Sequence, residues 1–197
     1  MNVLAKINLI LVAVFMLSFA PSEVLQPSDI RAPLIVENWE GDGTFKEISY
    51  QQSNNDDDIA DITEVEGNSA INGARSLRMK WRIKNGEYFY WGVDLRQGST
   101  DGLDVGEAQF LSFKVVLETG KEKFEIKIKD TNGINPGISS RSFLDQNTSI
   151  QTVKVPLARF GNRVDLYSLE NISLDFDRST AIKAGSIIID DVQFEFE

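Results

Sequence analysis

The stretch SLRMKWRIKNGEYFYWGVDLR, residues 76–96, decides the fold. Leu77, Met79, Trp81 and Ile83 alternate with polar residues, so Ser76–Ile83 predicts a strand with one buried face. Tyr88–Arg96 alternates in the same way. Its predicted inner face comprises Phe89, Trp91, Val93 and Leu95, and its predicted outer face comprises Tyr88, Tyr90, Asp94 and Arg96. Two adjacent strands with one apolar face each must bury those faces against another layer.

The rest of the chain continues this pattern in short segments separated by Gly, Asn and Asp turns. Phe110–Leu117 and the alternating residues around Phe124–Lys129 predict two strands, and we expect them to form a hairpin through the Thr119-Gly120 turn. Further strands are predicted at Leu34–Trp39, Thr148–Val155, Ile172–Phe176 and Ile187–Phe196. With no long helical period, the fold class predicted is all-β: an antiparallel β-sandwich, specifically a jelly roll, with at most a turn or two of helix.

The N-terminus has the form of an export signal. Lys6 precedes an apolar run that ends at Ala20 and is shorter than the ~20 residues a transmembrane helix needs. We expect residues 1–22 to be a signal peptide, 23–33 a linker and 34–197 the β-sandwich domain of a secreted, periplasmic or extracellular protein. Pro21 would directly follow a cut after Ala20, so a cut after Ser22 and retention as an anchor both stay open. Once the signal is removed, we expect no membrane association.

Charge and composition exclude several functions. The formal net charge of −10 disfavours nucleic acid and anionic membranes as partners. The chain has no Cys and no His, which excludes disulfides, thiolate chemistry and the usual neutral-pH general base. The acidic stretch Gln51–Asp61 lacks the Gly and Glu positions of an EF-hand, so we expect a solvated loop there.

One carboxylate of the last predicted strand occupies a position that alternation assigns to the apolar face. Asp190 shares the even numbering of Ile188, Val192 and Phe194, which predicts that it points into the interior, whereas Asp191 belongs to the polar face. A buried carboxylate must be paired, hydrogen-bonded or bound to a metal. Without His or Cys, an all-oxygen metal site would favour calcium, and a structural salt bridge is the alternative.

Several of these segments, in their order, resemble the jelly-roll carbohydrate-binding modules, especially those of family 11 in the galactose-binding-like group. The segments are VENWEG (36–41), NGARSLRMKW (72–81), YFYWGVDL (88–95), QFLSFKV (109–115), IKIKDTNG (126–133), VKVPLARF (153–160) and GSIIIDDVQF (185–194). The resemblance implies non-catalytic glycan binding on the outer face of one sheet. It also implies one structural calcium held by Glu40 and Asp190, with carbonyls near Asn72 and Gly73 as helpers; Glu37 is the alternative to Glu40.

Tyr suits a glycan-binding surface because it combines apolar area with a hydroxyl. The residues we therefore expect to bind glycan are Tyr88, Tyr90, Arg78, Asp94 and Arg96, with Lys80 and Arg82 beside them. The alternative is that these are ordinary surface residues and that Tyr serves strand propensity. Trp39, Trp81 and Trp91 follow the apolar parity and are expected in the core.

Two other functions remain open at this stage. A jelly-roll polysaccharide-degrading enzyme commonly uses the carboxylate spacing Glu-x-Asp-x-x-Glu, or a His with Tyr and Arg. The chain has neither this spacing nor a His, but Tyr and Arg could act alone. An envelope protein–protein interaction or assembly factor, similar to the complex I intermediate-associated family, could share the same fold. A separate glycan-active enzyme or an envelope protein could then be a partner.

Overall fold

The structure is a computed structural model that describes residues 31–41, 48–52, 60–83, 87–96, 98–177 and 181–196, with β2 described by its backbone alone. The signal segment 1–22 and the linker up to residue 30 lie outside the described residues. Among the residues described, no helix is long and apolar enough to cross a membrane.

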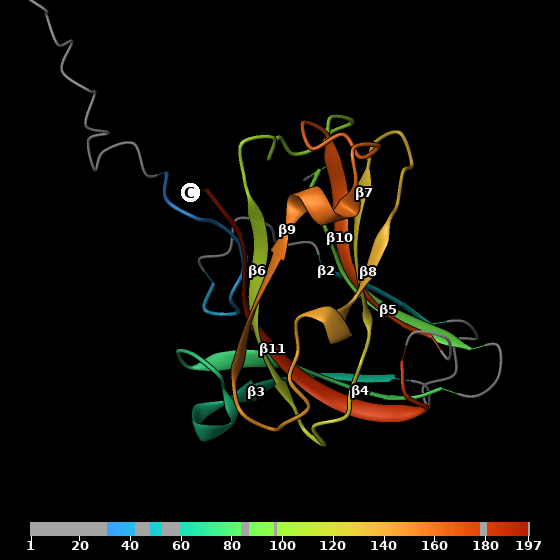
Figure 1. The fold of residues 1–197 in the computed structure, drawn as a ribbon. Coiled ribbons are helices and arrows are strands. Elements are labelled where there is room, and N and C mark those ends of the chain that lie inside the picture. Colours follow the sequence, from blue (N-terminus) through green and yellow to red (C-terminus); the bar gives the residue numbers. More distant parts are fainter. Residues whose placement is uncertain are drawn as a thin grey trace, which may run out of the picture.

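Two antiparallel sheets form the molecule (Figure 1). Sheet A has the strand order β3-β4-β11-β6-β9, with β1 paired to the far part of β11. Its strands are β1 (Leu34–Glu37), β3 (Ala60–Glu66), β4 (Arg75–Arg82), β6 (Phe110–Leu117), β9 (Gln151–Pro156) and β11 (Ala184–Glu195). Sheet B has the order β2-β5-β10-β7-β8. Its strands are β2 (Ile48–Gln52), β5 (Tyr88–Asp94), β7 (Glu125–Asp130), β8 (Gly137–Ser139) and β10 (Leu169–Asp177).

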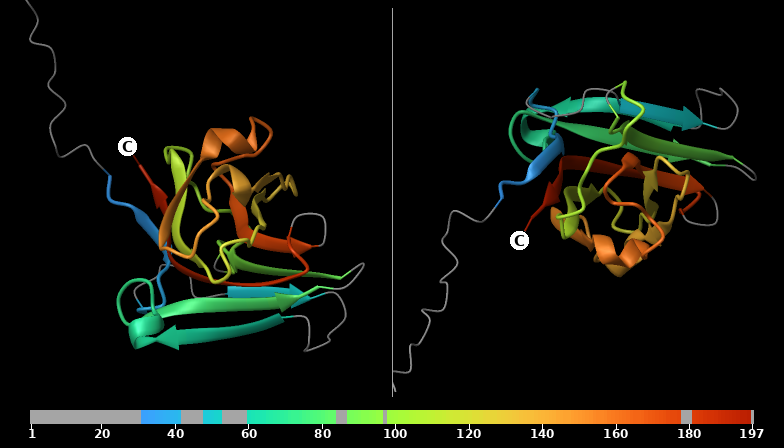
Figure 2. Two further views of the ribbon diagram at one scale, coloured as in Figure 1. Left: turned by 60° about the horizontal axis from the view of Figure 1, so that its bottom comes forward. Right: turned by 90° about the horizontal axis from the view of Figure 1, so that it is seen from above.

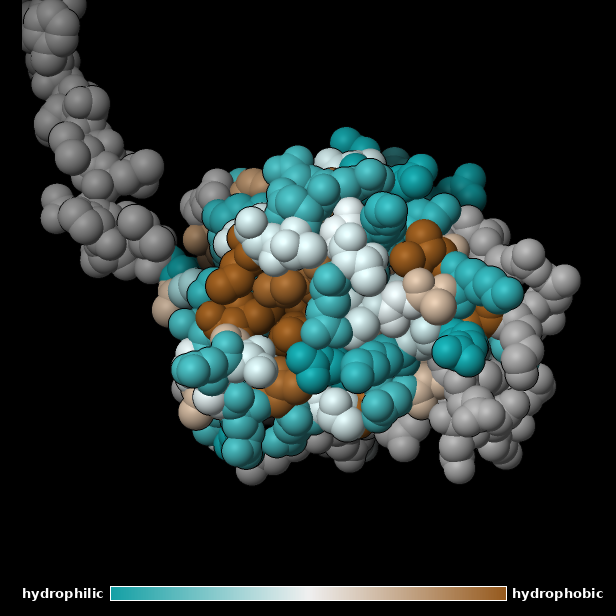
Figure 3. All heavy atoms as spheres, turned by 90° about the horizontal axis from the view of Figure 1, so that it is seen from below, coloured by the Kyte–Doolittle hydropathy of each residue, from teal (hydrophilic) through white to brown (hydrophobic). Residues whose placement is uncertain are grey.

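The predicted all-β sandwich is confirmed. Within the described residues, helix is limited to three short 3₁₀ segments, η2 (Gly67–Ser69), η3 (Ser140–Ser142) and η4 (Leu157–Phe160). Both views of Figure 2 show β3 and β4 side by side along one side of the molecule and the C-terminal end of β11 beside β1. From below, hydrophobic residues gather in one area of the surface that hydrophilic residues surround (Figure 3).

The core lies between the sheets and is rich in aromatic rings. Phe176 of β10 contacts Trp81 of β4 at 4.5 Å, Phe89 of β5 at 5.1 Å and Phe124 at 5.5 Å between ring centroids. The three tryptophans are 5% exposed or less, which confirms their prediction as core residues. The inner faces predicted for Ser76–Ile83 and Tyr88–Arg96 are buried as expected.

Two expectations about the strands were wrong. Phe110–Leu117 and Glu125–Asp130 do not form a hairpin, because β6 pairs with β11 and β9 in sheet A while β7 pairs with β10 and β8 in sheet B. The Thr119-Gly120 turn therefore carries the chain from one sheet to the other. Of the expected loop Gln51–Asp61, only the two ends are described, and they are strand: residues 51–52 end β2 and residues 60–61 begin β3, since edge strands can be polar and need little apolar alternation. Residues 53–59 of this expected loop lie outside the described residues.

Replacing Phe176 should destabilise the sandwich strongly. Phe176→Ala removes a fully buried ring that packs between strands of both sheets, so unfolding should cost about 3–5 kcal/mol less than in the parent. Urea unfolding followed by tryptophan fluorescence measures this. Ile150→Ala, at a site 58% exposed, is the control and should change stability by less than about 0.5 kcal/mol. Equal effects of the two substitutions would contradict the assignment of the core.

Candidate functional site

The outer face of sheet B carries most of the residues expected to bind a ligand. Register places the side chains of alternate residues of β5, β10 and β7 on this face, in rows that run across the strands. One row joins Tyr90, Asp175 and Glu125, and another joins Asp94, Asn171 and Lys129. Tyr88, 38% exposed, stands opposite Asp177 at the end of the face, and Tyr90 is half-buried.

Between these two rows, small residues line the face on β5 and β10. Gly92 of β5 pairs with Ser173 of β10, and the same row then continues to the long side chain of Lys127 on β7. A Cβ atom on Gly92 would lie 2.9 Å from the carbonyl oxygen of Ile172 and 3.1 Å from Nδ2 of Asn171. The Asn171 amide donates to the carbonyl oxygen of Val93 at 2.9 Å and so leans over the glycine. The result is a low strip of surface between an aromatic and acidic row and a mixed polar row.

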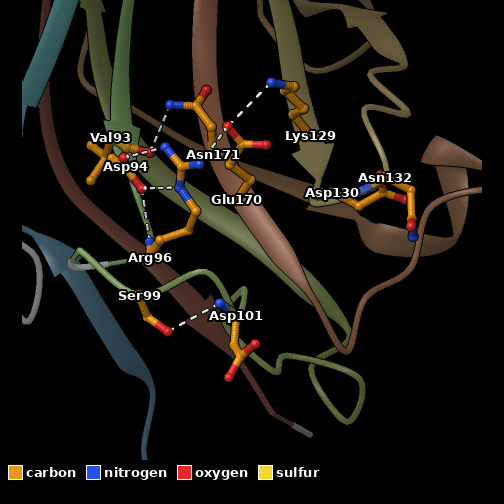
Figure 4. Close-up of polar contacts among 10 residues, drawn as sticks. All are labelled: Val93, Asp94, Arg96, Ser99, Asp101, Lys129, Asp130, Asn132, Glu170 and Asn171. Atoms are coloured by element: carbon orange, nitrogen blue, oxygen red, sulfur yellow. Dashed lines mark hydrogen bonds and ion pairs between the residues drawn. The ribbon is translucent and has the colours of Figure 1, made fainter.

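A network of four charged side chains occupies one end of the face (Figure 4). Arg96 donates to both carboxylate oxygens of Asp94, with Nε to Oδ1 at 3.1 Å and Nη2 to Oδ2 at 2.8 Å. Its Nη1 lies 3.2 Å from Glu170 Oε1, and Lys129 Nζ approaches the same oxygen at 3.2 Å. Hydrogen bonds from Arg96 outweigh burial and hold the pKa of Asp94 below its ordinary value. The network fixes the polar atoms that a ligand would meet.

A second network lies near the middle of the face. Lys127 Nζ is 2.6 Å from Asp175 Oδ2 and 3.2 Å from Glu125 Oε2. Ser173 Oγ donates to the other Asp175 oxygen at 2.7 Å. Burial alone would lower the pKa of Lys127, but the hydrogen bonds and charges of Asp175 and Glu125 outweigh it and raise that pKa. Lys127, Glu125 and Asp175 are residues that the sequence interpretation missed, because the pairing of β7 with β10 could not be read from the alternation of either strand.

Arg78, Lys80 and Arg82 do not join this face. They lie on β4 with their side chains on the outer side of sheet A, so the sandwich core separates them from Tyr88 and Tyr90. Arg78 Nη2 forms an ion pair with Glu118 Oε1 at 3.0 Å. The structure therefore brings together four of the five expected glycan-binding residues, Tyr88, Tyr90, Asp94 and Arg96.

A shallow concavity at the end of sheet B was also missed. It has a volume of about 380 Å³ and is lined by Gly106, Asn162, Arg163, Val164, Asp165, Leu166 and Tyr167. Tyr167 is 67% exposed, and its ring covers Gly106 so closely that a Cβ there would lie 2.3 Å from Cε1. Asp165 Oδ1 accepts the Tyr167 backbone N–H at 3.0 Å, while Asp130 Oδ2 accepts the Asp165 N–H at 3.0 Å. The Tyr167 ring is thus exposed on a loop that hydrogen bonds hold in place.

Asp190 is fully buried, as expected, but on a different side of the sheet. Its register partner is Lys114, whose neighbours Phe113 and Val115 face the core, so Asp190 belongs with Ile188 on the outer side of sheet A. A bulge between Asp190 and Gln193, with φ of 51° at Asp191, reverses the alternation of β11. Before the bulge, Ile187 and Ile189 face the core; after it, Val192 and Phe194 do. The predicted inward direction was wrong because parity cannot be counted through a bulge.

Loop 71–76, which includes the first two residues of β4, covers Asp190. Asp190 Oδ2 accepts hydrogen bonds from the Asn72 N–H at 3.0 Å and from Ser76 Oγ at 2.7 Å, and Oδ1 accepts the Asp191 N–H at 2.8 Å. Burial raises the pKa of Asp190 despite these three hydrogen bonds. Asp191 bonds to the Asn72 side-chain amide at 2.9 Å and pairs with Lys114 at 2.7 Å.

Glu40 contacts the same loop from another direction. Its Oε1 accepts the N–H groups of Ala74 at 2.6 Å and Arg75 at 2.7 Å. Gly73 allows this approach, since it has φ of 63° and a Cβ there would lie 2.5 Å from Glu40 Oε1. Glu37 instead accepts the N–H groups of Asn38 and Trp39 within its own segment.

The fit of this region to a metal ion is partial. Glu40 and Asp190 supply carboxylate oxygens on one loop, which is the donor type that calcium prefers. However, among the residues that the structure describes, no three acidic side chains come together as a metal-binding group. A cation bound to these two carboxylates would therefore need backbone carbonyls or water to complete its coordination shell.

The fold is that of a carbohydrate-binding module. The chain belongs to the family described as carbohydrate binding domain 30, whose model matches residues 32–196. Carbohydrate binding is accordingly the function of this domain. No curated protein matches the chain.

Solved structures show the same fold. The chain is similar to the family 11 carbohydrate-binding module of the cellulosomal cellulase Lic26A-Cel5E of Clostridium thermocellum, with a TM-score of 0.60, 15% identity and coverage of 84% of this chain and 95% of that one. A family 11 module from the same organism, in complex with a β-1,3-1,4-mixed-linked tetrasaccharide, has a TM-score of 0.58 and 16% identity, with coverage of 83% of this chain and 95% of that one. The family 30 module of the cellulosomal cellulase Cel9D-Cel44B from that organism has a TM-score of 0.53 and 18% identity, with coverage of 85% of this chain and 95% of that one. The resemblance to carbohydrate-binding modules is confirmed, although the matching family model is that of family 30 and not family 11.

The Asp94–Arg96 pair should give stability a specific pH dependence. Because the pKa of Asp94 is lowered in the folded state, its contribution is present above the ordinary value of ~3.9 and is lost as pH falls through the folded pKa. Asp94→Asn should therefore be less stable than the parent at about pH 6, and the difference should shrink toward about pH 2. Urea unfolding at both pH values measures it.

The control is a double-mutant cycle with Arg96→Gln. In the Arg96→Gln background, Asp94→Asn should show a much smaller dependence on pH, because the guanidinium that lowers the pKa is absent. The same pH dependence in both backgrounds would contradict this assignment.

Proposed function

We propose that the outer face of sheet B is the surface on which this domain binds glycan, and that the Tyr167 concavity extends it. The observation that carries the proposal is the low strip at Gly92 and Ser173, with Tyr90 on one side and the ordered polar groups of Asn171 and Arg96 on the other. A sugar ring has apolar C–H faces and a rim of hydroxyls. Such a strip offers both an aromatic wall and fixed hydrogen-bonding partners.

The ordering of the polar side chains favours binding. Lys127, Asp175 and Glu125 already hold one another, so a ligand would not need to immobilise them. Each Asp or Glu oxygen retains capacity to accept from a sugar hydroxyl. Side chains held before binding lower the entropic cost of recognition, which otherwise weakens binding to flexible polar surfaces.

Tyr167 lies within reach of the same glycan chain. Asn171 is four positions further along the chain, so the two Cα atoms are at most ~14 Å apart. Asn162 and Arg163 border the concavity and offer donors to hydroxyl groups beside the exposed ring. A glycan of several units could therefore contact both the strip and the Tyr167 ring.

We propose that the domain acts on its ligand by binding alone. The chain has no His, and on the outer face of sheet B Asp94, Asp175 and Glu170 form ion pairs with Arg96, Lys127 and Lys129. No segment has the spacing Glu-x-Asp-x-x-Glu. Degradation of the bound glycan would then require a separate glycan-active enzyme.

Tyr90 should be needed for binding. In affinity electrophoresis on soluble glycans, with β-1,3-1,4-mixed-linked glucan as the first probe, Tyr90→Ala should weaken retention about tenfold, equivalent to ~1.4 kcal/mol. Tyr88→Ala and Tyr167→Ala should weaken it less, because these rings lie toward the ends of the proposed surface.

The matched control for this experiment is on the other sheet. Arg78→Ala and Lys80→Ala change the outer side of sheet A and should leave retention unchanged. If the sheet-A variants lose retention and the tyrosine variants do not, the binding surface is on the opposite side. Retention of the parent on no glycan of a broad panel would overturn the proposed function.

We also propose that Glu40 and Asp190 hold a structural calcium ion, with the carbonyls of Asn72 and Gly73 as further ligands. The support is the convergence of both carboxylates on loop 71–76 and the burial of Asp190 without a cationic partner among its hydrogen bonds. Calcium would neutralise a carboxylate that burial disfavours as an anion.

Removal of calcium should lower the melting temperature. An ion that binds only the folded state at ~100 times its Kd contributes about 2.7 kcal/mol, which EGTA should abolish. Differential scanning calorimetry with and without EGTA, followed by addition of excess calcium, measures this. Asp190→Asn should remove the response. A melting curve that EGTA does not change, together with no bound metal by elemental analysis, would show that the hydrogen bonds alone stabilise this loop.

A further inference from the structure

On β5, β7, β10 and the turn after β5, the described cations are all held by carboxylates, whereas Arg163 borders the separate Tyr167 concavity. Among the residues described on this face, Arg96 pairs with Asp94 and Glu170, Lys129 pairs with Glu170, and Lys127 pairs with Asp175 and Glu125. Asp177 lies on the same face opposite Tyr88. In these ion pairs, four carboxylates accompany three cations: Asp94, Glu125, Glu170 and Asp175 against Arg96, Lys127 and Lys129.

This arrangement has a consequence for charged ligands. The Lys127, Asp175 and Glu125 side chains are 22%, 22% and 25% exposed, so their pairs are partly shielded from water and from salt. A sugar carboxylate or sulfate would have to replace an existing carboxylate partner or lie near excess negative charge. A neutral hydroxyl can instead donate to the carboxylates and accept from the ammonium groups without breaking a pair.

We propose that Glu170 and Asp175 are specificity-determining residues that exclude anionic glycans by occupying Lys129 and Lys127. This inference rests on the proposed location of the glycan surface. Selection here is by repulsion of the wrong ligand: the same lysines, without their partners, would attract carboxylated sugars. The acidic excess of the face acts in the same direction as the formal net charge of −10.

The test uses one glycan in two charge states. The probes are β-1,3-1,4-mixed-linked glucan and its carboxymethylated derivative, compared by affinity electrophoresis at neutral pH and low salt. The parent should bind the carboxymethylated form at least tenfold more weakly than the neutral form. Raising the salt toward ~1 M should reduce this difference, because the Debye length falls to about 3 Å.

The double variant Glu170→Gln/Asp175→Asn should remove most of the preference for the neutral form. Both substitutions keep side-chain size and remove two negative charges from the face, while Arg96 retains Asp94 and Lys127 retains Glu125. Binding of the carboxymethylated glucan relative to the neutral form should rise about tenfold, and a cooperative urea-unfolding transition would show that the variant is folded.

The matched control is Glu118→Gln/Glu195→Gln. It changes the net charge by the same amount but releases Arg78 and Lys154 on sheet A. It should show no gain for the carboxymethylated glucan.

Three results would overturn the inference. The parent could bind both forms equally, the double variant could gain no more than the control, or the parent's discrimination could be independent of salt. Failure of the parent to bind any glycan in the broad panel is a different result, because it removes the proposed function as well.

Discussion

Phe176 packs against rings from both sheets, and the rest of the molecule is arranged around this apolar layer. Trp81 comes from β4 in sheet A, whereas Phe89 comes from β5 beside Phe176 in sheet B. Because each strand can turn only alternate residues toward this layer, the other residues must face water. The core therefore determines the composition of both outer faces, including the one assigned to glycan binding.

The outer face of sheet B shows how pairing converts scattered polar residues into a surface. Tyr90 and Asp175 belong to segments 85 residues apart in sequence and meet only because β5 pairs with β10 in one register. A shift of that register by one residue would turn Phe176 outward and Asp175 inward. Burial of Phe176 thus holds the charged network in place.

The packing of β11 depends on a β-bulge in the middle of the strand. The bulge at Asp190 and Asp191 reverses the alternation of β11, so one strand can place isoleucines in the core along its first half and Phe194 along its second. The carboxylate released at the reversal is satisfied by loop 71–76, which Glu40 also holds. Together these contacts connect the segment after β1, the loop before β4 and the middle of β11.

The sequence alone determined the properties that depend on local alternation. The all-β class, most strands, the core tryptophans and the outward position of Tyr88, Tyr90 and Asp94 follow from a period of two residues, which any half-buried strand must show. Only the tertiary structure decided which strands are neighbours. In the structure, Arg78 lies on the opposite sheet from the tyrosines, and Lys127 forms an ion pair with Asp175. Tyr167 is exposed above Gly106, and Asp190 faces the outer side of sheet A and not the core. These outcomes depend on long-range pairing and on a bulge, and neither leaves a signal in the alternation of a single strand.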